Sequence, residues 1–333
     1  MSRWLQRSWY GPRPISFFIP LSWLFAGLSA LRRGCYRSGL FYTASLPVPV
    51  IVAGNISVGG TGKTPFIVWL AERLTQQGYR PGIVTRGYGG SSRHVRLVTP
   101  ESDADELGDE AVLLARRTRL PVAAGRDRAT AARLLLSRFS LDVLLSDDGL
   151  QHYSLPRSFE FILLDGGRGL GNRWLLPAGP LREPPERLDK AGMVVIKDVT
   201  GGKLDLPSAV HMRLDTDTAV SLLDGSRRPL SSFSGQSVHA LAGIADPEQF
   251  FAALRAAGIT VEGRALPDHA RLGSLDLEFP GNGPVFMTEK DAVKCRGMKL
   301  PRHWYVEASA VFDAAVATAI IERVKPLLRR QDG

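Results

Sequence analysis

The sequence predicts an α/β protein with a doubly wound, mostly parallel sheet, a second and smaller α/β domain, and a membrane-associated helix at the N-terminus. Three observations carry this prediction. Strand-like and helix-like segments alternate after residue 45, a glycine-rich turn joins the first such strand to a helix, and an uncharged apolar run occupies residues 15–31. Alternation of this kind is typical of sheets that carry helices on both faces and bind ligands at the carboxyl ends of their strands.

The apolar run at 15–31 favours contact with a membrane. Arginines and interfacial aromatic residues flank the run, namely Arg3, Arg7, Arg13, Arg32, Arg33 and Arg37 together with Trp4, Trp9 and Tyr10. Its length is near the lower limit of about 17 residues for a spanning helix, and Pro20 lies inside it, so a span and a helix lying in the interface both stay open. A signal peptide is disfavoured by the phosphate-binding loop that follows, and a buried core helix is the remaining alternative.

The turn after the first predicted strand has the composition of a phosphate-binding loop. The β-branched run 48–53 predicts a buried strand, and the apolar spacing in 66–74 predicts an amphipathic helix. Glycines between them allow backbone N–H groups to surround an anionic oxygen, and the helix N-terminus adds positive charge. The residues expected to contact a nucleoside triphosphate here are Ser57, Val58, Gly59, Gly60, Thr61, Gly62, Lys63 and Thr64.

Two residues of this loop have specific expected roles. Lys63 should reach the β- and γ-phosphates of ATP, and the Thr64 hydroxyl should bind Mg²⁺. The general pattern G-x-x-x-x-G-K-[ST] has glycine where this chain has Ser57. A bare glycine-rich turn is the alternative, but the flanking strand and helix favour a P-loop NTPase-like fold.

The remaining elements define the expected domains. In the first unit we expect strands near 48–56, 80–86, 95–98, 122–124, 141–146, 160–165 and 193–197, and helices near 64–77, 110–117 and 126–139. A looser stretch at 200–236 predicts a connector with a hairpin. Elements near 238–242, 247–257, 259–266 and 285–288 and a terminal helix near 312–329 predict the second unit. The expected organisation is a membrane-associated segment at 1–40, a nucleotide-binding core at 41–215, a linker and hairpin at 216–236, and a smaller domain at 237–333.

Composition narrows the class of partner. The chain has 333 residues, of which 44% are hydrophobic, as in ordinary globular proteins. Its formal charge is +9, and arginine supplies 34 of its 42 basic residues, which suits recognition of phosphate by forked donors. The basic residues are scattered and the sequence has no zinc spacing or RNA-binding motif, so nucleic acid is not an expected partner. Cys35 and Cys295 are too few for a disulfide framework, so a reducing compartment fits.

Several polar residues follow predicted strands. One apolar strand ends in Asp147 and Asp148, the form of a Walker B element that holds Mg²⁺. Because adjacent strand residues face opposite sides, we expect one of the two to touch the metal, while turn capping is the alternative for the other. Taken singly, Asp109 reads as a helix cap and His269 as a surface histidine.

Taken together, these segments resemble a known family. In order along the chain the motifs are G-N-I-S-V-G-G-T-G-K-T-P, R-G-Y-G-G, G-D-E, S-D-D-G-L-Q-H, P-A-G-P-L-R-E-P, P-D-H and T-E-K-D-A-V-K. This order resembles the tetraacyldisaccharide 4'-kinase family of lipid A biosynthesis, over nearly the whole chain. The family resembles this chain in having serine at the position of Ser57. It often has a second histidine where this chain has Ala270, so His269 is taken as the matching residue.

The resemblance implies an activity and a location. The implied enzyme lies on the cytoplasmic face of the inner membrane and transfers the γ-phosphate of ATP to the 4'-hydroxyl of a tetraacylated, 1-phosphorylated glucosamine disaccharide, so segment 41–215 would be a kinase core. Exposing the four acyl chains of this acceptor to water would cost about 0.8 kcal/mol per CH₂. The enzyme is therefore expected to reach the acceptor at the membrane, which explains a membrane-associated N-terminus.

The resemblance also implies residue roles. Asp109 would be the general base, with His269 as its partner in a dyad completed by closure of the two units. The remaining implied roles are metal coordination or its surroundings for Asp147, Asp148 and Glu183, phosphate contact for Arg182, and packing near the nucleotide for Tyr88.

Two other functions compete with a kinase. One is a P-loop switch ATPase of the partitioning or metal-delivery type, although many of those have a lysine where this chain has Val58. The other is a non-enzymatic ATP sensor at the membrane. GTP is disfavoured as the nucleotide because the residues Thr288 to Asp291 have the wrong order for a base-reading N-K-x-D motif.

Overall fold

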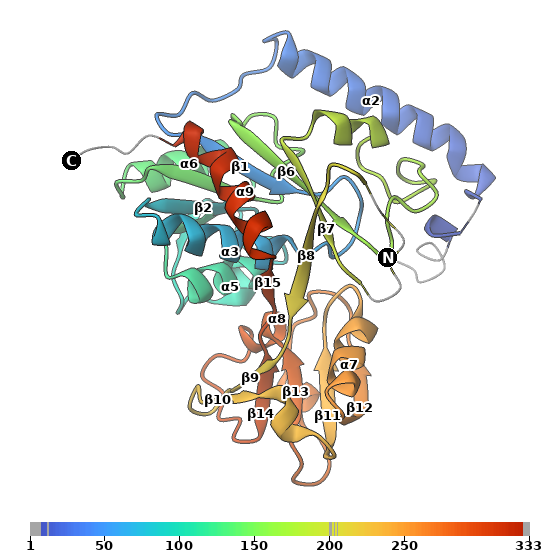
Figure 1. Ribbon diagram of the computed structural model, residues 1–333, viewed down its shortest axis with the longest axis vertical. Coiled ribbons are helices and arrows are strands. Elements are labelled where there is room, and N and C mark those ends of the chain that lie inside the picture. The colour runs from blue at the N-terminus through green and yellow to red at the C-terminus, as the bar shows by residue number, and fades with distance from the viewer. Residues whose placement is uncertain (1–7, 12, 200–201, 203, 205, 329–333) are drawn as a thin grey trace.

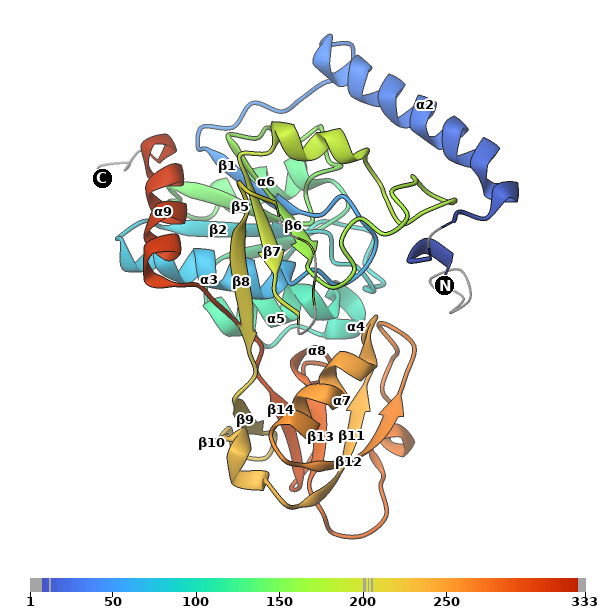
Figure 2. The ribbon, with the colours of Figure 1, turned by 45° about the vertical axis from the view of Figure 1, so that its right-hand side comes forward.

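The computed structural model describes residues 8–11, 13–199, 202, 204 and 206–328, so Arg3, Trp4 and Arg7 lie outside the described residues. The chain forms two α/β units, and the helix α2 (Ile19–Arg37) lies along the outside of the larger unit, at the end far from the smaller one (Figures 1 and 2). Among the described residues, no helix combines the length and the apolar character needed to cross a bilayer.

The larger unit is built on a nine-stranded sheet with the order β15-β8-β7-β6-β1-β5-β2-β4-β3. Its strands are β1 (Val50–Gly54), β2 (Pro81–Thr85), β3 (Arg96–Val98), β4 (Val122–Ala124), β5 (Val143–Asp147), β6 (Phe159–Asp165), β7 (Met193–Lys197), β8 (Val210–Asp215) and β15 (Ser309–Val311). All neighbours pair in parallel except the two edge strands, β3 and β15, which are antiparallel to β4 and β8. The predicted mostly parallel sheet is confirmed.

Helices cover both faces of this sheet, as a doubly wound fold requires. The helices α3 (Lys63–Gln76), α5 (Asp109–Thr118) and α9 (Ala314–Val324) contribute buried side chains to the core on one face. The helix α6 (Arg128–Leu136) packs on the other face. A single turn, α4 (Ala104–Leu107), precedes α5. Short 3₁₀ segments occur at Ser16–Phe18, Pro185–Lys190, Leu230–Phe233, Ser274–Leu277 and Lys325–Leu327.

The smaller unit has its own six-stranded sheet, in the order β10-β9-β14-β13-β11-β12. Its strands are β9 (Thr218–Ser221), β10 (Arg227–Pro229), β11 (Ser237–Ala242), β12 (Thr260–Ala265), β13 (Val285–Thr288) and β14 (His303–Val306). The helix α7 (Pro247–Ala256) buries Phe251 and Leu254 in the core of this unit, and the single turn α8 (Glu289–Ala292) follows β13 directly.

The chain crosses between the units twice, from β8 to β9 and back from β14 to β15. The two crossings run antiparallel to one another, because β15 pairs with β8 and β14 pairs with β9. After the second crossing, α9 buries Ile320 and Val324 in the core of the larger unit. This placement corrects the expectation that the terminal helix belongs to the smaller unit: its buried side chains lie in the same core as those of α3 and β15, not in the core of the second sheet.

Candidate active site

The phosphate-binding loop lies at the carboxyl end of β1, in the middle of the large sheet. It runs from Asn55 to Gly62 and leads directly into α3 at Lys63. Gly62 has a left-handed backbone with φ of 80°, and Gly59 has φ of 122°, conformations that a side chain would strain. The loop therefore needs glycine at these two positions to turn its N–H groups inward at the start of the helix.

The pairing of β1 with β5 brings the predicted Walker B acids to this loop. Ala53 is in register with Asp147, so the last residue of β5 lies beside the first turn of the loop. Asp148 follows with a left-handed φ of 50°, and its carboxylate lies 3.7 Å from the Nζ atom of Lys63. The sheet thus brings together Lys63, Asp147 and Asp148, as the sequence predicts.

The two acids have opposite electrostatic environments. Asp147 is buried, and burial together with the nearby Glu110 carboxylate raises the pKa of Asp147 to about 7. Burial acts in the same direction on Asp148, but Lys63 and Arg182 outweigh it and hold the pKa of Asp148 at about 2. Asp148 is therefore ionised at neutral pH. Asp147 is only partly ionised there, and a further cation beside it would favour its ionised form.

A strand-like segment ending at Glu183 runs beside the loop. Ser57 pairs with Leu181, and the Arg182 N–H donates to the carbonyl of Ile56 at 2.6 Å. These backbone contacts place Arg182 next to Asp148, at 3.3 Å. Glu183, which is buried, accepts a 2.8 Å hydrogen bond from the side chain of Gln151 and pairs with Arg187 at 3.2 Å, so it supports this wall of the site.

The residues at the loop fit Mg²⁺ if phosphate oxygens complete its ligands. The Oδ1 atom of Asp147 and the hydroxyl of Thr61 are buried and make no hydrogen bond to any described residue. Within the described part of the chain, no group of three or more His, Cys, Asp and Glu side chains could hold a metal alone. Mg²⁺ suits this arrangement because it typically binds one or two carboxylates together with substrate phosphates.

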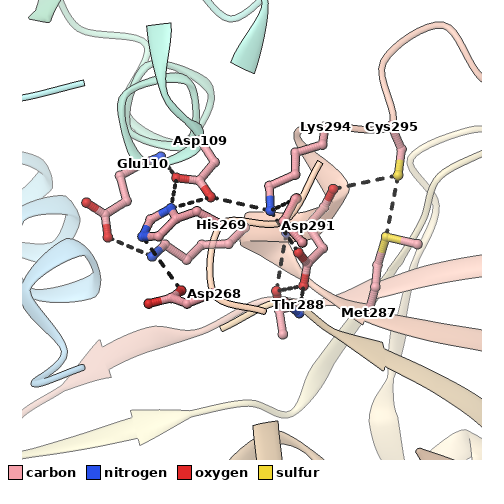
Figure 3. Close-up of polar contacts among 12 residues, drawn as sticks. Asp109, Glu110, Asp268, His269, Met287, Thr288, Asp291, Lys294 and Cys295 are labelled. Carbon is pink, nitrogen blue, oxygen red and sulfur yellow. Dashed lines mark hydrogen bonds and ion pairs between the residues drawn. The ribbon is translucent and has the colours of Figure 1, made fainter. Parts of the chain in front are cut away.

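Asp109 and His269 meet across the two units, although 160 residues separate them. The Nδ1 atom of His269 lies 2.9 and 3.0 Å from the two carboxylate oxygens of Asp109, at the first turn of α5 (Figure 3). Asp109 is only 3% exposed. Burial raises the pKa of its carboxyl group, but the hydrogen bond from His269 and the charges of Lys290 and Lys294 outweigh burial and lower that pKa below its ordinary value.

Charged residues without an assigned role surround this dyad. Lys294 donates to Asp291 and to the carbonyl of Ala270, both at 3.0 Å, and its Nζ atom lies 3.5 Å from Asp109 (Figure 3). Lys290 lies 2.7 Å from Glu110, beside the dyad. In the sequence these residues stand out only as members of the motifs G-D-E and T-E-K-D-A-V-K. The position of a lysine along the chain does not predict which acid it will pair with in the fold.

Tyr88 lies on the dyad. Its ring meets the imidazole of His269 edge-on, with the centroids 4.7 Å apart, and its side chain is otherwise half exposed. Packing of Tyr88 against a nucleotide stays a prediction.

Comparisons with known proteins relate the whole chain to one family. The model of a family described as tetraacyldisaccharide-1-P 4'-kinase matches residues 15–325. The chain is 46% identical to the tetraacyldisaccharide 4'-kinase of Methylobacillus flagellatus, over 99% of this chain and 98% of that protein. It is 43% identical to the kinase of the same name from Nitrosococcus oceani, over 98% of this chain and 95% of that protein.

A solved structure has the same fold. The crystal structure of LpxK from Aquifex aeolicus in complex with ATP superimposes with a TM-score of 0.78 at 28% identity, over 94% of this chain and 99% of that one. The match covers both units and the crossings between them. The chain therefore belongs to the tetraacyldisaccharide-1-phosphate 4'-kinase family.

Proposed function

We propose that this protein transfers the γ-phosphate of ATP to the 4'-hydroxyl of a tetraacyldisaccharide 1-phosphate, with Asp109 as the general base. The observation that carries the proposal is the contact between Asp109 and His269, which come from different units; Glu110, next to Asp109, lies near enough to Lys63 of the phosphate-binding loop for their charges to interact. A switch ATPase transfers phosphate to water. It therefore has no need of a general base for a sugar hydroxyl that is assembled from residues of two units.

Asp109 accepts the proton of the attacking hydroxyl in this mechanism. Its lowered pKa makes it a weak base, and a weak base suffices because phosphoryl transfer has a loose transition state, in which the attacking hydroxyl has formed little bond to phosphorus and still keeps most of its proton. His269 donates from Nδ1 to the carboxylate and so holds Asp109 ionised and oriented. Lys294 adds a positive charge at 3.5 Å from the Asp109 carboxylate.

Lys63 binds the β- and γ-phosphates, exchanging its contact with Asp148 for phosphate oxygens. Thr64 and Asp147 would hold Mg²⁺ directly, with Asp148 and Glu183 around them. Arg182, which already faces Asp148, is placed to contact phosphate. When bound, Mg²⁺ offsets the negative charge that the transferring group shares with the leaving oxygen.

The smaller unit also contacts the larger one beside the phosphate-binding loop. Lys197, buried at the end of β7, lies 3.5 Å from the carbonyl of Gly60 and 3.2 Å from Gln249 of α7. Arg168 pairs with Asp246, the residue before α7. These contacts and the dyad hold the second unit over the loop, where it excludes water that would otherwise accept the phosphate.

Helix α2 supports a location at the cytoplasmic face of the inner membrane. Its outward side presents large apolar residues to solvent, namely Phe17 just before it and Leu21, Trp23, Leu24, Leu28 and Leu31. Only Ser22 of this helix is buried, and it donates to the carbonyl of Leu175. An exposed apolar stripe flanked by Arg13 and Arg32 suits a helix that lies in the interface and places the enzyme beside its lipid acceptor.

Label transfer tests the proposal. The full-length protein is incubated with γ-labelled ATP and the tetraacyldisaccharide 1-phosphate in detergent micelles, and the lipid and aqueous phases are counted separately. A kinase gives labelled glycolipid that depends on the acceptor, and Lys63→Met abolishes it. Release of labelled inorganic phosphate at the same rate with and without acceptor, and no labelled lipid, would instead indicate a switch ATPase.

A further inference from the structure

His269 lies in a turn with a strained backbone. Its φ of 58° is left-handed, a conformation that is uncommon for residues other than glycine. Strained backbone of this kind persists where the surrounding contacts hold it in place. Two hydrogen bonds bracket the turn, from the His269 N–H to the carbonyl of Gly243 at 3.2 Å and from the Ala270 N–H to the carbonyl of Pro267 at 3.0 Å. The direction in which the imidazole points therefore depends on what holds this turn.

Asp291 is linked to both sides of this turn. Its Oδ2 atom accepts from the Gly243 N–H at 2.9 Å, so it fixes the residue whose carbonyl binds the backbone of His269. Its Oδ1 atom accepts from the Nζ atom of Lys294 at 3.0 Å (Figure 3). The same Nζ atom donates at 3.0 Å to the carbonyl of Ala270, the residue directly after His269. One carboxylate thus reaches both ends of the turn, through Gly243 on one side and Lys294 on the other.

Asp291 is itself firmly held by its own unit. Its side chain is completely buried, and it accepts a 2.7 Å hydrogen bond from the hydroxyl of Thr288, which in turn accepts from the Asp291 N–H at 3.2 Å. The side chain of Lys294 is only 5% exposed. Buried ion pairs often add little to folding stability, because the desolvation of both charges offsets their attraction. The fixed geometry of this pair therefore suits the orientation of a neighbour better than the stabilisation of the fold.

The sheet of the smaller unit brings these residues together. The strands β11 and β13 are adjacent and parallel, with Leu241 in register with Met287, so both end at the same edge of the sheet. Gly243 follows the first of these strands, and Asp291 lies in the turn α8 that follows the second. The segment with His269 follows β12, which pairs with β11 in parallel. This edge of the sheet therefore presents His269 to the larger unit already oriented.

We infer that Asp291 is a positioning residue for phosphate transfer to the acceptor, an inference that rests on the function proposed above. Asp291 holds the turn of His269 through Gly243 and Lys294, and so fixes the direction from which the imidazole meets Asp109. It acts through the imidazole and not by contact with the acceptor or with ATP. Misplacement of a catalytic group by about 1 Å can lower turnover about 10²-fold, so a loosened turn should reduce kcat and leave substrate binding intact.

A double-mutant cycle between Asp291→Asn and His269→Ala tests this inference in the full-length protein. Asparagine keeps the shape of the side chain but carries no charge, so its hydrogen bonds with Gly243 and Lys294 weaken. The kcat for labelled glycolipid is measured on the pH plateau of each enzyme, so that a changed ionisation of Asp109 does not enter the comparison.

The two backgrounds should respond differently. With His269 present, Asp291→Asn should lower kcat about tenfold or more, while KM for ATP and KM for the acceptor change by less than about twofold. In the His269→Ala background, Asp291→Asn should change kcat by less than about twofold, because no imidazole is left to position.

Gly243→Ala supplies a second variant that keeps every charge. A Cβ atom at this position would lie 2.8 Å from the Oδ1 atom of Asp291, closer than such atoms come in real structures, so the carboxylate must move. This variant should repeat the pattern, with a lower kcat when His269 is present and no further loss in the His269→Ala background. It decides the question if Asp291→Asn does not fold.

Asp142→Asn is the matched control. Asp142 is only 3% exposed and pairs with Arg80 at 2.8 Å, so it too is a buried carboxylate in an ion pair. It directly precedes β5, whereas Asp147 of the active site ends that strand. The control variant should have a lower melting temperature, but its kcat well below that temperature should stay within about twofold of the wild-type value.

The outcomes separate the inference from the function on which it rests. An equal loss of kcat from Asp291→Asn in both backgrounds would overturn the inference, because a purely structural role does not depend on the imidazole. An unchanged kcat in Gly243→Ala and in folded Asp291→Asn would overturn it as well. Failure of the wild type to label the glycolipid would instead reject the kinase function itself.

Discussion

The protonation state of Asp109 is set by two opposing effects, its own burial and the polar and charged groups around it, among them His269. Burial alone would push the Asp109 carboxyl toward its neutral form, which cannot accept a proton. The hydrogen bond from His269 opposes that effect, as do the charges of Lys290 and Lys294. The imidazole therefore acts on the reaction through the protonation state and orientation of the carboxylate.

The effect of His269 on the pKa of Asp109 predicts the behaviour of His269→Ala. Without the imidazole, the pKa of Asp109 rises because burial is then opposed only by the two lysines. The carboxylate is lost at a higher pH, so the acid limb of the kcat profile should move to higher pH while kcat at the plateau also falls. The exposed His94 supplies the control, since His94→Ala should leave the profile unchanged. A slower variant with an unshifted acid limb would contradict this role of His269.

At the scale of secondary-structure elements, the single turn α8 positions the helix α5, which carries Asp109. The turn α8 contacts α5 at two points through neighbouring residues of opposite charge. Glu289 pairs with Arg117 at 2.9 Å, and Lys290 pairs with Glu110 at 2.7 Å. The paired residues of α5 are seven apart and lie on one side of that helix. This double contact fixes the helix that begins with Asp109.

The apolar stripe of α2 predicts a specific defect in membrane binding. Leu28 on α2 and Leu223 in the smaller unit are both 59% exposed, so they form a matched pair. Leu28→Glu should lower the fraction of protein that floats with anionic vesicles by about tenfold, since one buried leucine contributes about 1.5–3 kcal/mol. Leu223→Glu should float like the wild type, and deletion of residues 1–35 should abolish flotation. Unchanged flotation of the deletion would rule out this role for the N-terminus.

At the scale of the whole molecule, the two units are held together over the loop largely by charged contacts. Lys290 and Lys294 face Glu110 and Asp109 on one side, and Arg168 faces Asp246 on the other. The cores of the two units are otherwise separate, but Val293, which follows α8 in the smaller unit, is buried in the core of the larger unit. The charged contacts and this one apolar contact therefore decide how the units sit together.

The charged interface predicts a loss of stability in acid. Lys290 and other nearby groups outweigh burial and lower the pKa of Glu110, and the pKa of Asp109 is lowered as well, relative to ordinary values of 4.5 and 3.8. Below these ordinary values the unfolded chain binds more protons, so the contribution is present above about pH 4 and falls as pH drops through the lowered pKa values. Denaturant unfolding of the wild type between pH 3 and 6 should show this fall. Asp109→Asn/Glu110→Gln should show a shallower slope, and equal slopes would contradict the interface.

How much of the structure can be predicted from the sequence depends on how far apart along the chain the interacting residues lie. The loop at Lys63 and the acids at Asp147 are readable because their geometry is local, set by one turn and by neighbouring strands. The meeting of Asp109 with His269 has no local signal, so it entered only through the family resemblance. The periodicity of 312–329 revealed a helix but not which sheet covers it, and α9 packs on the larger unit. The lysines of 290–294 were readable as charges, but only the fold shows their partners.

In the mechanism proposed here, Asp109 acts on the acceptor hydroxyl, while ATP is bound by the phosphate-binding loop. The most direct measurement compares kcat for glycolipid phosphorylation with the Kd for ATP in the wild type and in Asp109→Asn, which keeps the shape of the side chain but cannot accept a proton. We expect kcat to fall by about 10²–10⁴-fold and Kd to change by less than about threefold. Near-normal kcat in the variant, or a Kd that weakens as much as kcat falls, would contradict it.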